Sequence, residues 1–283
     1  MNFNLNMNRY ETAPDTKRSF FDILFCGARW YLLYRYIKCV FELVREFRIE
    51  KKRIKQAKQK GLEYNFDPFM LTALKGQRTI DITEACGGKF FIDGLEHLRN
   101  NQEPVVIIGN HMSLLETFAL NGVILPYFKA TFVIKTQLKN MKVFGIIMQE
   151  LQAIDVKRQN PKEDFSAVIE KGTQALNSGI SVVVFPQSTR VPYFDVNQFN
   201  SIGIKLAKNA GVKVIPLAIR TDFLSCGKIL RDFGPLKREL PIRFSFGAPL
   251  EISGTGKDQQ NQIVEFIKSK MKEWNVKIVN AAE

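Results

Sequence analysis

Apolar side chains recur at intervals of three and four residues from Ser19 to Phe47, which is the spacing of one face of an α-helix. A helix that spans a bilayer needs about 20 nearly continuous apolar residues. This stretch is interrupted by charged residues, namely Asp22, Arg29, Arg35, Lys38, Glu42, Arg45 and Glu46. The pattern therefore predicts a long amphipathic helix, broken near Gly27, that does not cross a membrane as a simple span.

The texture changes after Gly88, where short runs rich in β-branched and aromatic residues alternate with helical segments. The predicted strands are 89–93, 105–109, 131–135, 181–185, 212–219 and 242–246. The predicted helices are 113–123, 137–150, 162–177, 198–209 and 257–274. Alternation of this kind favours an α/β fold, a mainly parallel sheet flanked by helices, with the amphipathic helical region preceding it.

Charge is concentrated in the N-terminal region. The 283 residues include 41 Lys and Arg against 28 Asp and Glu, a formal net charge of +13. Residues 1–60 contain 14 basic and 6 acidic side chains and so carry +8 of that excess. Aromatic and aliphatic groups with cations beside them suit insertion at an anionic membrane surface, where each basic group near the headgroups adds ~1 kcal/mol. The alternative is a helix packed on the protein's own core, with Lys51–Lys60 as a solvated face.

Other features limit the classes of partner and cofactor. The aromatic residues cluster with aliphatic ones and form no stacking platform among Lys and Arg, so we expect no nucleic acid partner. Four cysteines lack a C-x-x-C pair and only two histidines are present, so we expect no metal and no redox cofactor. The polar segment Met1–Arg18 lacks the apolar core of a signal peptide, and we expect a protein that is not exported.

These patterns divide the chain into three predicted parts. The first is a polar segment at residues 1–18, the second an amphipathic helical membrane-docking region at 19–75, and the third an α/β domain at 76–283. The stretch Gly61–Gly88 is the expected junction, because it contains Asn65-Phe-Asp-Pro68 and Gly87-Gly88.

Chemically useful side chains follow the predicted strands, where active groups collect in open α/β sheets. His111 and Glu116 come directly after strand 105–109, five residues apart. On a continuous helix they would point about 140° apart, so a contact between them requires a strand-to-helix turn. Ser113-Leu-Leu-Glu116 also fits a capping box, in which Glu116 only starts a helix. The sequence alone leaves both interpretations open.

Cations and hydroxyls follow other strands. Strand 181–185 leads into Pro186-Gln-Ser-Thr-Arg190, whose donors suit bidentate binding of phosphate, and Lys157 with Arg158 forms a second basic loop. Either segment alone also fits an ordinary exposed turn. Lys135, at the end of its strand, is a weaker candidate at the same edge.

The order of these motifs resembles a known family. Asn110-His111-x-Ser113-x-x-Glu116, Lys157-Arg158, Phe185-Pro-Gln-Ser-Thr-Arg190 and Val214-Ile-Pro-Leu-Ala218 are similar to the blocks of the glycerolipid acyltransferase superfamily (1-acylglycerol-3-phosphate acyltransferase-like, the lysophospholipid acyltransferase family). The resemblance covers roughly Lys89 to Phe246. The family usually has Asp where this chain has Glu116; the related lipid A acyltransferases have Glu there, as this chain does. The family also usually reads Phe-Pro-Glu-Gly-Thr-Arg, and in this chain Gln187 and Ser188 replace its Glu and Gly.

The resemblance implies a membrane-peripheral acyltransferase on the cytoplasmic face of the cell membrane. Its acyl donor would be acyl-CoA or acyl carrier protein and its acceptor a lysophospholipid, with no resident cofactor. His111 would be the general base and Glu116 its orienting carboxylate. The implied phosphate-binding residues are Lys157, Arg158, Thr189 and Arg190, with Lys135 and Ser188 as further candidates. Two alternatives remain: a lipid A-type acyltransferase with a His-x4-Glu site, and a non-catalytic basic membrane-binding protein.

An apolar slot for the acyl chain is also implied. Its candidate lining residues, which could equally be ordinary core, are Phe118, Leu120, Phe144, Ile147 and Met148.

Overall fold

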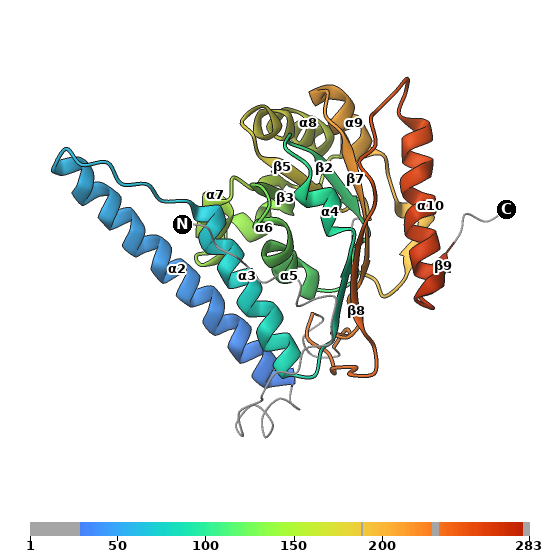
Figure 1. Ribbon diagram of the computed structural model, residues 1–283, viewed down its shortest axis with the longest axis horizontal. Coiled ribbons are helices and arrows are strands. Elements are labelled where there is room, and N and C mark those ends of the chain that lie inside the picture. The colour runs from blue at the N-terminus through green and yellow to red at the C-terminus, as the bar shows by residue number, and fades with distance from the viewer. Residues whose placement is uncertain (1–28, 188, 228–231, 280–283) are drawn as a thin grey trace.

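The computed structural model describes residues 29–187, 189–227 and 232–279 (Figure 1). The polar segment predicted at 1–18, the start of the 19–47 pattern and Ser188 lie outside the described residues.

A seven-stranded sheet in the order β1-β8-β7-β2-β5-β3-β4 forms the core (Figure 1). Neighbouring strands pair in parallel except β7 and β8, where Leu217 lies opposite Phe246 in an antiparallel pair. The mainly parallel sheet predicted from the sequence is thus confirmed. The strands are β1 Phe90–Asp93, β2 Val106–Gly109, β3 Ala130–Lys135, β4 Ile154–Val156, β5 Ser181–Val184, β7 Val214–Arg220 and β8 Ile242–Phe246.

The central strands β2, β5 and β7 are buried at every position, which explains why they are continuous Val and Ile runs without polar alternation. Strands β7, β2, β5, β3 and β4 all run in the same direction, so their carboxyl ends meet at one edge. Strand β4 and the small second sheet of β6 Phe194–Asp195 and β9 Ile278–Val279 were not predicted, because runs of two or three residues carry too little pattern.

Helices cover both faces of the sheet. Helix α10 packs on β7 from one side, and α5, backed by α3, lies on the other (Figure 1). The helices after β1 are α4 Leu95–Arg99, α5 Leu115–Ile124, α6 Thr136–Lys139, α7 Phe144–Glu150, α8 Pro161–Asn177, α9 Ile202–Ala210 and α10 Lys257–Glu273, with a 3₁₀ turn η2 at Val196–Gln198.

The single helix predicted at 137–150 is wrong, because the chain breaks between α6 and α7. Asp155 on β4 accepts hydrogen bonds from Lys139 Nζ at 2.9 Å and from Thr136 Oγ1 at 3.2 Å, which holds α6 against that strand. The chain then folds back so closely that a Cβ on Gly145 would lie 2.2 Å from the Lys139 carbonyl oxygen. A tertiary ion pair and a glycine contact therefore override the helical spacing.

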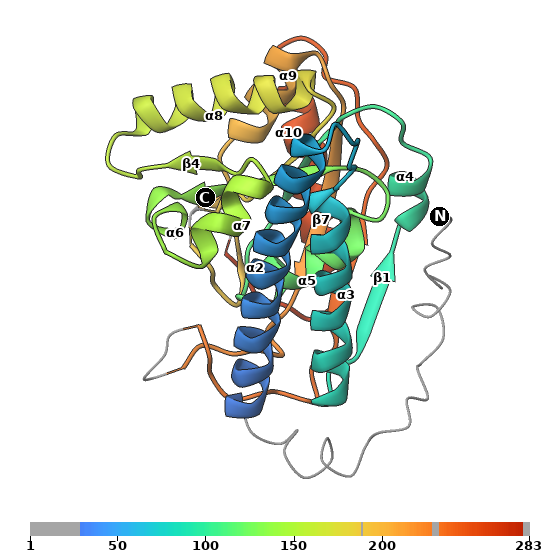
Figure 2. The same ribbon diagram turned by 90° about the vertical axis from the view of Figure 1, so that its left-hand side faces the viewer.

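Two long helices, α2 Arg29–Gln59 and α3 Pro68–Ala85, run side by side along the molecule (Figure 2). Helix α3 begins at Pro68, and the carboxylate of Asp67 caps it by accepting from Phe69 N at 2.9 Å. It meets α5 backbone to backbone, since a Cβ on Gly76 would lie 2.1 Å from the nitrogen of Gly122. The stretch expected to be a junction thus contains a packed helix, and the boundary expected at residue 76 falls inside it.

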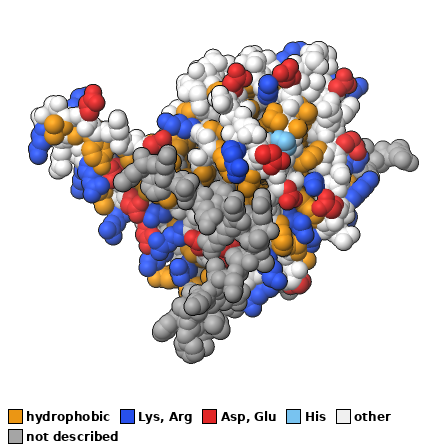
Figure 3. Space-filling view, viewed as in Figure 1, with side chains coloured by type: hydrophobic (Ala, Val, Ile, Leu, Met, Phe, Trp, Pro, Cys, Tyr) orange, Lys and Arg blue, Asp and Glu red, His pale blue; other side chains and the backbone are white. Residues whose placement is uncertain are grey.

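Helix α2 has one face on the core and another exposed. Its buried side chains are Leu32, Tyr36, Cys39, Leu43, Val44 and Phe47. Lys and Arg side chains line the arm that α2 forms at the edge of the molecule (Figure 3). Among the described residues no helix is long and apolar enough to cross a bilayer.

Candidate active site

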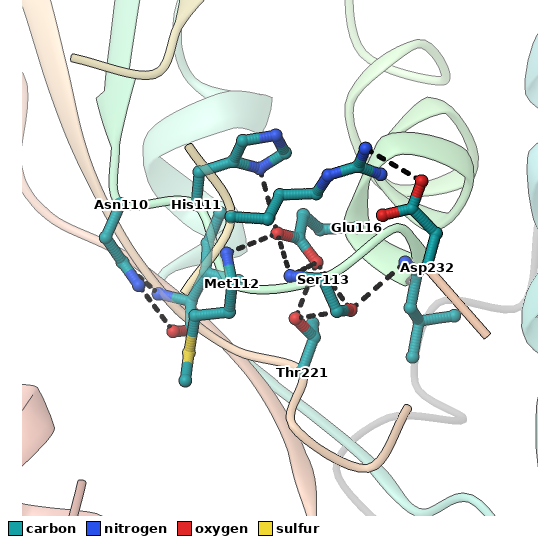
Figure 4. Close-up of polar contacts among 10 residues, drawn as sticks. Asn110, His111, Met112, Ser113, Glu116, Thr221 and Asp232 are labelled. Atoms are coloured by element: carbon teal, nitrogen blue, oxygen red, sulfur yellow. Dashed lines mark hydrogen bonds and ion pairs between the residues drawn. The ribbon is translucent and has the colours of Figure 1, made fainter. Parts of the chain in front are cut away.

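A buried carboxylate organises the loop that follows β2. Glu116, in the first turn of α5, has no exposed surface. Its Oε1 lies 3.0 Å from His111 Nδ1 and accepts hydrogen bonds from the backbone nitrogens of Met112 at 2.6 Å and Ser113 at 2.8 Å. Its Oε2 accepts from the hydroxyls of Ser113 at 3.0 Å and Thr221 at 2.5 Å (Figure 4). The carboxylate is therefore saturated with donors.

The capping and pairing interpretations use the same carboxylate and are compatible. The contact from Ser113 N to Glu116 is half of a capping box. The other half differs, because Ser113 Oγ accepts from Leu115 N at 3.1 Å and the helix begins at Leu115. The strand-to-helix turn lets Glu116 start α5 and hold the His111 ring at the same time.

The pKa of Glu116 reflects opposing effects. Burial raises the pKa of this carboxyl. The hydrogen bond and charge of His111, together with the hydrogen bonds from Thr221 and Ser113, lower the pKa by more than burial raises it, so the net pKa lies below its usual range. A carboxyl whose pKa is lowered on folding stabilises the fold above its unfolded pKa, and that contribution is lost as the pH falls through its folded pKa. Glu116 is therefore an anion at neutral pH.

The His111 ring is held from two sides. It stacks on Phe185, from the loop after β5, with ring centroids 4.5 Å apart and an interplanar angle of 4°. The preceding Asn110 is fully buried and exchanges two hydrogen bonds of 2.8 Å with the backbone of Ile219 on β7 (Figure 4). With Nδ1 directed at Glu116, the other ring nitrogen, Nε2, is left for a substrate.

A pocket of about 620 Å³ opens beside His111 at the carboxyl edge of the sheet. The predicted site residues among its lining are His111, Lys135, Arg158, Thr189 and Arg190. Glu116 lies behind His111. Lys157 is exposed and does not line the pocket; its backbone N–H donates to Asp164 at 2.9 Å. Four of the six residues predicted to bind phosphate thus reach one pocket, and Ser188 lies outside the described residues.

Backbone geometry distinguishes Arg158 from its neighbour. Its φ of 57° lies in the left-handed region that favours glycine, and its side chain lines the pocket. Strained positions of this kind often occur where a side chain must be aimed at a ligand.

Sequence analysis missed Thr221 and Asp232. Thr221 directly follows β7, so the rule that singled out the other loops could have found it. Asp232 lies in the long connection between β7 and β8 and pairs with Arg190, with Asp232 Oδ2 3.1 Å from Arg190 Nη2. No pattern in that connection indicates which residue returns to the pocket. Within the described chain no group of His, Cys, Asp and Glu side chains suits a metal ion.

A narrower apolar cavity of about 70 Å³ adjoins the pocket between α2, α3, α5 and α7. The two share Thr117, Phe132, Ile134 and Phe144. Of the residues predicted to form an acyl slot, the structure brings Phe118, Phe144, Ile147 and Met148 to this cavity, whereas Leu120 is buried in the core.

Comparison with known proteins connects this geometry to a family. Residues 89–220 match the family model described as Acyltransferase. A 1-acyl-sn-glycerol-3-phosphate acyltransferase of Pseudomonas aeruginosa is 33% identical over 132 residues, which are 47% of this chain and 49% of that protein. A probable enzyme of the same name from Mycoplasma pneumoniae is 29% identical over 42% of this chain and 45% of that protein. The chain thus spans about half the length of the curated relatives that it matches.

A solved structure extends the likeness in fold. The crystal structure of the 1-acyl-sn-glycerophosphate (LPA) acyltransferase PlsC from Thermotoga maritima superimposes with a TM-score of 0.65 at 17% identity, covering 86% of this chain and 94% of that one. The range 89–220 contains all the predicted site residues, and the resemblance inferred from motif order is confirmed. Residues 89–220 of this chain are therefore similar to the Acyltransferase family, and the solved structure shows the same fold.

Proposed function

We propose that the protein is an O-acyltransferase that moves a fatty acyl group from acyl-CoA or acyl carrier protein to the hydroxyl of a lysophospholipid such as 1-acylglycerol-3-phosphate. The observation that carries the proposal is the His111–Glu116 pair, joined at 3.0 Å, beside a pocket whose described lining includes three cationic side chains. The names of the curated relatives support the same reaction.

The chemistry follows from the ring geometry. His111 Nε2 removes the proton of the acceptor hydroxyl as its oxygen attacks the thioester carbonyl. The Glu116 carboxylate holds Nδ1 and stabilises the imidazolium that forms. The tetrahedral intermediate then collapses, the carbon–sulfur bond breaks, and the departing thiolate takes the proton from His111. No covalent acyl-enzyme is required.

The pocket lining supports a phosphate-bearing acceptor. Lys135, Arg158 and Arg190 contribute positive charge and Thr189 a hydroxyl donor. A guanidinium can bind a phosphate through two parallel hydrogen bonds, which fixes the orientation of the acceptor as well as its affinity. The adjoining apolar cavity then suits the acyl chain, since its lining is mainly aliphatic and aromatic.

Arg190→Ala is expected to raise the KM for 1-acylglycerol-3-phosphate by about 10- to 100-fold, the value of a hydrogen bond to a charged group. The KM for the donor should stay nearly unchanged, and Arg190→Lys should restore affinity only in part because the fork geometry is lost. Steady-state kinetics with each substrate varied in turn measures both constants. A rise confined to the donor KM would assign Arg190 to the donor site instead.

The exposed face of α2 supports a membrane-peripheral enzyme. Tyr34, Ile37 and Phe41, at helical spacing, are 59%, 45% and 57% exposed. The same face continues into four exposed cations, Arg45, Arg48, Lys52 and Lys55. An apolar strip followed by a cationic strip fits a helix that inserts its first half into an anionic bilayer and lays its second half on the headgroups. We propose that α2 docks in this way on the cytoplasmic face of the cell membrane.

The decisive assay mixes the purified protein and vesicles with one acyl donor and one acceptor at a time. The donors are an acyl-CoA and an acylated acyl carrier protein, and the acceptors are 1-acylglycerol-3-phosphate and a lipid A-type sugar lipid. We expect thiol release and a diacyl phospholipid product. Transfer to the sugar lipid alone would overturn the proposed lysophospholipid acceptor. This alternative is tested because the related lipid A acyltransferases also have Glu at the position of Glu116. Vesicle binding without transfer to either acceptor would identify a non-catalytic membrane protein.

A further inference from the structure

The guanidinium that the acceptor phosphate would use already has a partner. Arg190 Nη2 lies 3.1 Å from Asp232 Oδ2, and both side chains line the pocket. Asp232 is the acidic side chain among the described lining residues, against the cations Lys135, Arg158 and Arg190. Its side chain is 42% exposed, so solvent and a ligand can reach it.

Backbone pairing fixes Asp232 at this wall. Gly234 N donates to Ser225 O at 2.8 Å and Lys237 N to Phe223 O at 2.8 Å, which joins the two ends of the segment that carries it. Next to Asp232, Phe233 is buried, and its ring packs edge-on against Tyr36 of α2 with centroids 6.3 Å apart. The carboxylate therefore stays beside the subsite even when a ligand displaces it from Arg190.

We propose that Asp232 is an affinity-setting residue of the phosphate subsite, whose carboxylate occupies Arg190 in the empty pocket and competes with the phosphate of the acceptor. The proposal rests on the proposed function. The phosphate is chemically unchanged by acyl transfer, so every contact to it holds substrate and product equally and does not raise kcat. Without Asp232, Arg190 would have no competitor for the phosphate and would hold the diacyl product more tightly. A carboxylate that pairs with Arg190 again weakens the binding of both the acceptor and the diacyl product, and so favours product release.

Asp232→Asn keeps the shape of the side chain and removes its charge. We expect the KM for 1-acylglycerol-3-phosphate and the inhibition constant of its diacyl product to fall together by about 2- to 5-fold, the range of a partly exposed ion pair. The donor KM should not change. Glu239→Gln is the matched control, because Glu239 is an exposed acid in the same β7–β8 connection that does not line the pocket. It should leave all three constants unchanged.

A double-mutant cycle isolates the competition. In an Arg190→Ala background the gain from Asp232→Asn should be clearly smaller, because only the direct repulsion between carboxylate and phosphate is left to remove. An unchanged gain in that background, or a rise in the acceptor KM from Asp232→Asn alone, would overturn the proposal, since Asp232 would then act independently of Arg190 or hold it in place for the ligand. Titration with inorganic phosphate, followed by calorimetry, tests the same cycle without turnover. A protein that transfers no acyl group would sink the proposed function, whereas tighter phosphate binding by Asp232→Asn that depends on Arg190 would still establish the competition.

Discussion

His111→Ala is expected to lower kcat by on the order of 10²–10⁴, the usual contribution of positioned acid–base catalysis. The fold should survive, because the ring lies at the pocket and its main packing partner is the face of Phe185. Turnover measured with saturating donor and acceptor, together with a thermal melt, separates the two effects. His97→Ala is the matched control, since His97 is the other histidine of the chain, lies on α4 and is not among the pocket residues.

Glu116→Gln is the sharper probe of how the pair works. A glutamine can direct its carbonyl oxygen at the Oε1 position, where it still accepts from His111 and the two backbone nitrogens. Its amide would then face the hydroxyls of Ser113 and Thr221, which can rotate to accept. The cap is kept and the negative charge is lost, so we expect a folded protein with kcat reduced on the order of 10²-fold.

Two further outcomes test this assignment. Glu116→Asp should keep measurable activity, because the charge remains one methylene away. A destabilised Glu116→Gln protein with near-normal turnover would mean that the carboxylate only caps α5. Turnover at the wild-type rate in His111→Ala would refute the mechanism whatever the motifs suggest.

The sequence predicted the parts of the site that depend on local order and strand direction. Val and Ile runs marked β2 and β5, and the parallel sheet brings the loops after them to one edge, so His111 and Arg190 could be expected in the same place. The sequence did not predict that Arg158 lines the pocket whereas Lys157 does not. Arg158 also has a positive φ, a local backbone conformation that residue spacing does not encode.

The contact between Arg190 and Asp232 could not be predicted, because Asp232 reaches the site through a long connection and lies more than 40 residues from Arg190 in sequence. Thr221 directly follows β7, and attention to every strand end could have found it. For α2 the sequence left two alternatives, a helix packed on the protein's own core and a helix inserted at a membrane surface. In the structure one face of α2 packs on the core and another is exposed, because Leu32 and Phe47 pack inward while Tyr34 and Phe41 point outward.

Replacing Ile37 and Phe41 by Ser is expected to lower binding to anionic vesicles by about 10- to 100-fold, since each side chain is about half exposed on α2 and burying that half contributes roughly 0.7–1.5 kcal/mol. Buried apolar area is not screened by ions, so this loss should be the same at low and high salt. Flotation with vesicles rich in anionic lipid, at both ionic strengths, measures it. Point variants are needed, because the inward face of α2 belongs to the core and removing the helix would expose Tyr36 partners such as Phe118.

The cationic half of the same face should behave differently. Arg45→Gln with Lys52→Gln removes two charges worth ~1 kcal/mol each near the headgroups. Its effect should be clear at low salt and nearly vanish at high salt, because a Debye length of ~3 Å at 1 M screens these charges.

The matched control for the Ile37 and Phe41 variant is Phe165→Ser, which replaces an exposed aromatic residue on α8 and should float like the wild type. If the Ile37 and Phe41 variant also floats like the wild type at both salt concentrations, this face is solvated and α2 does not dock through it.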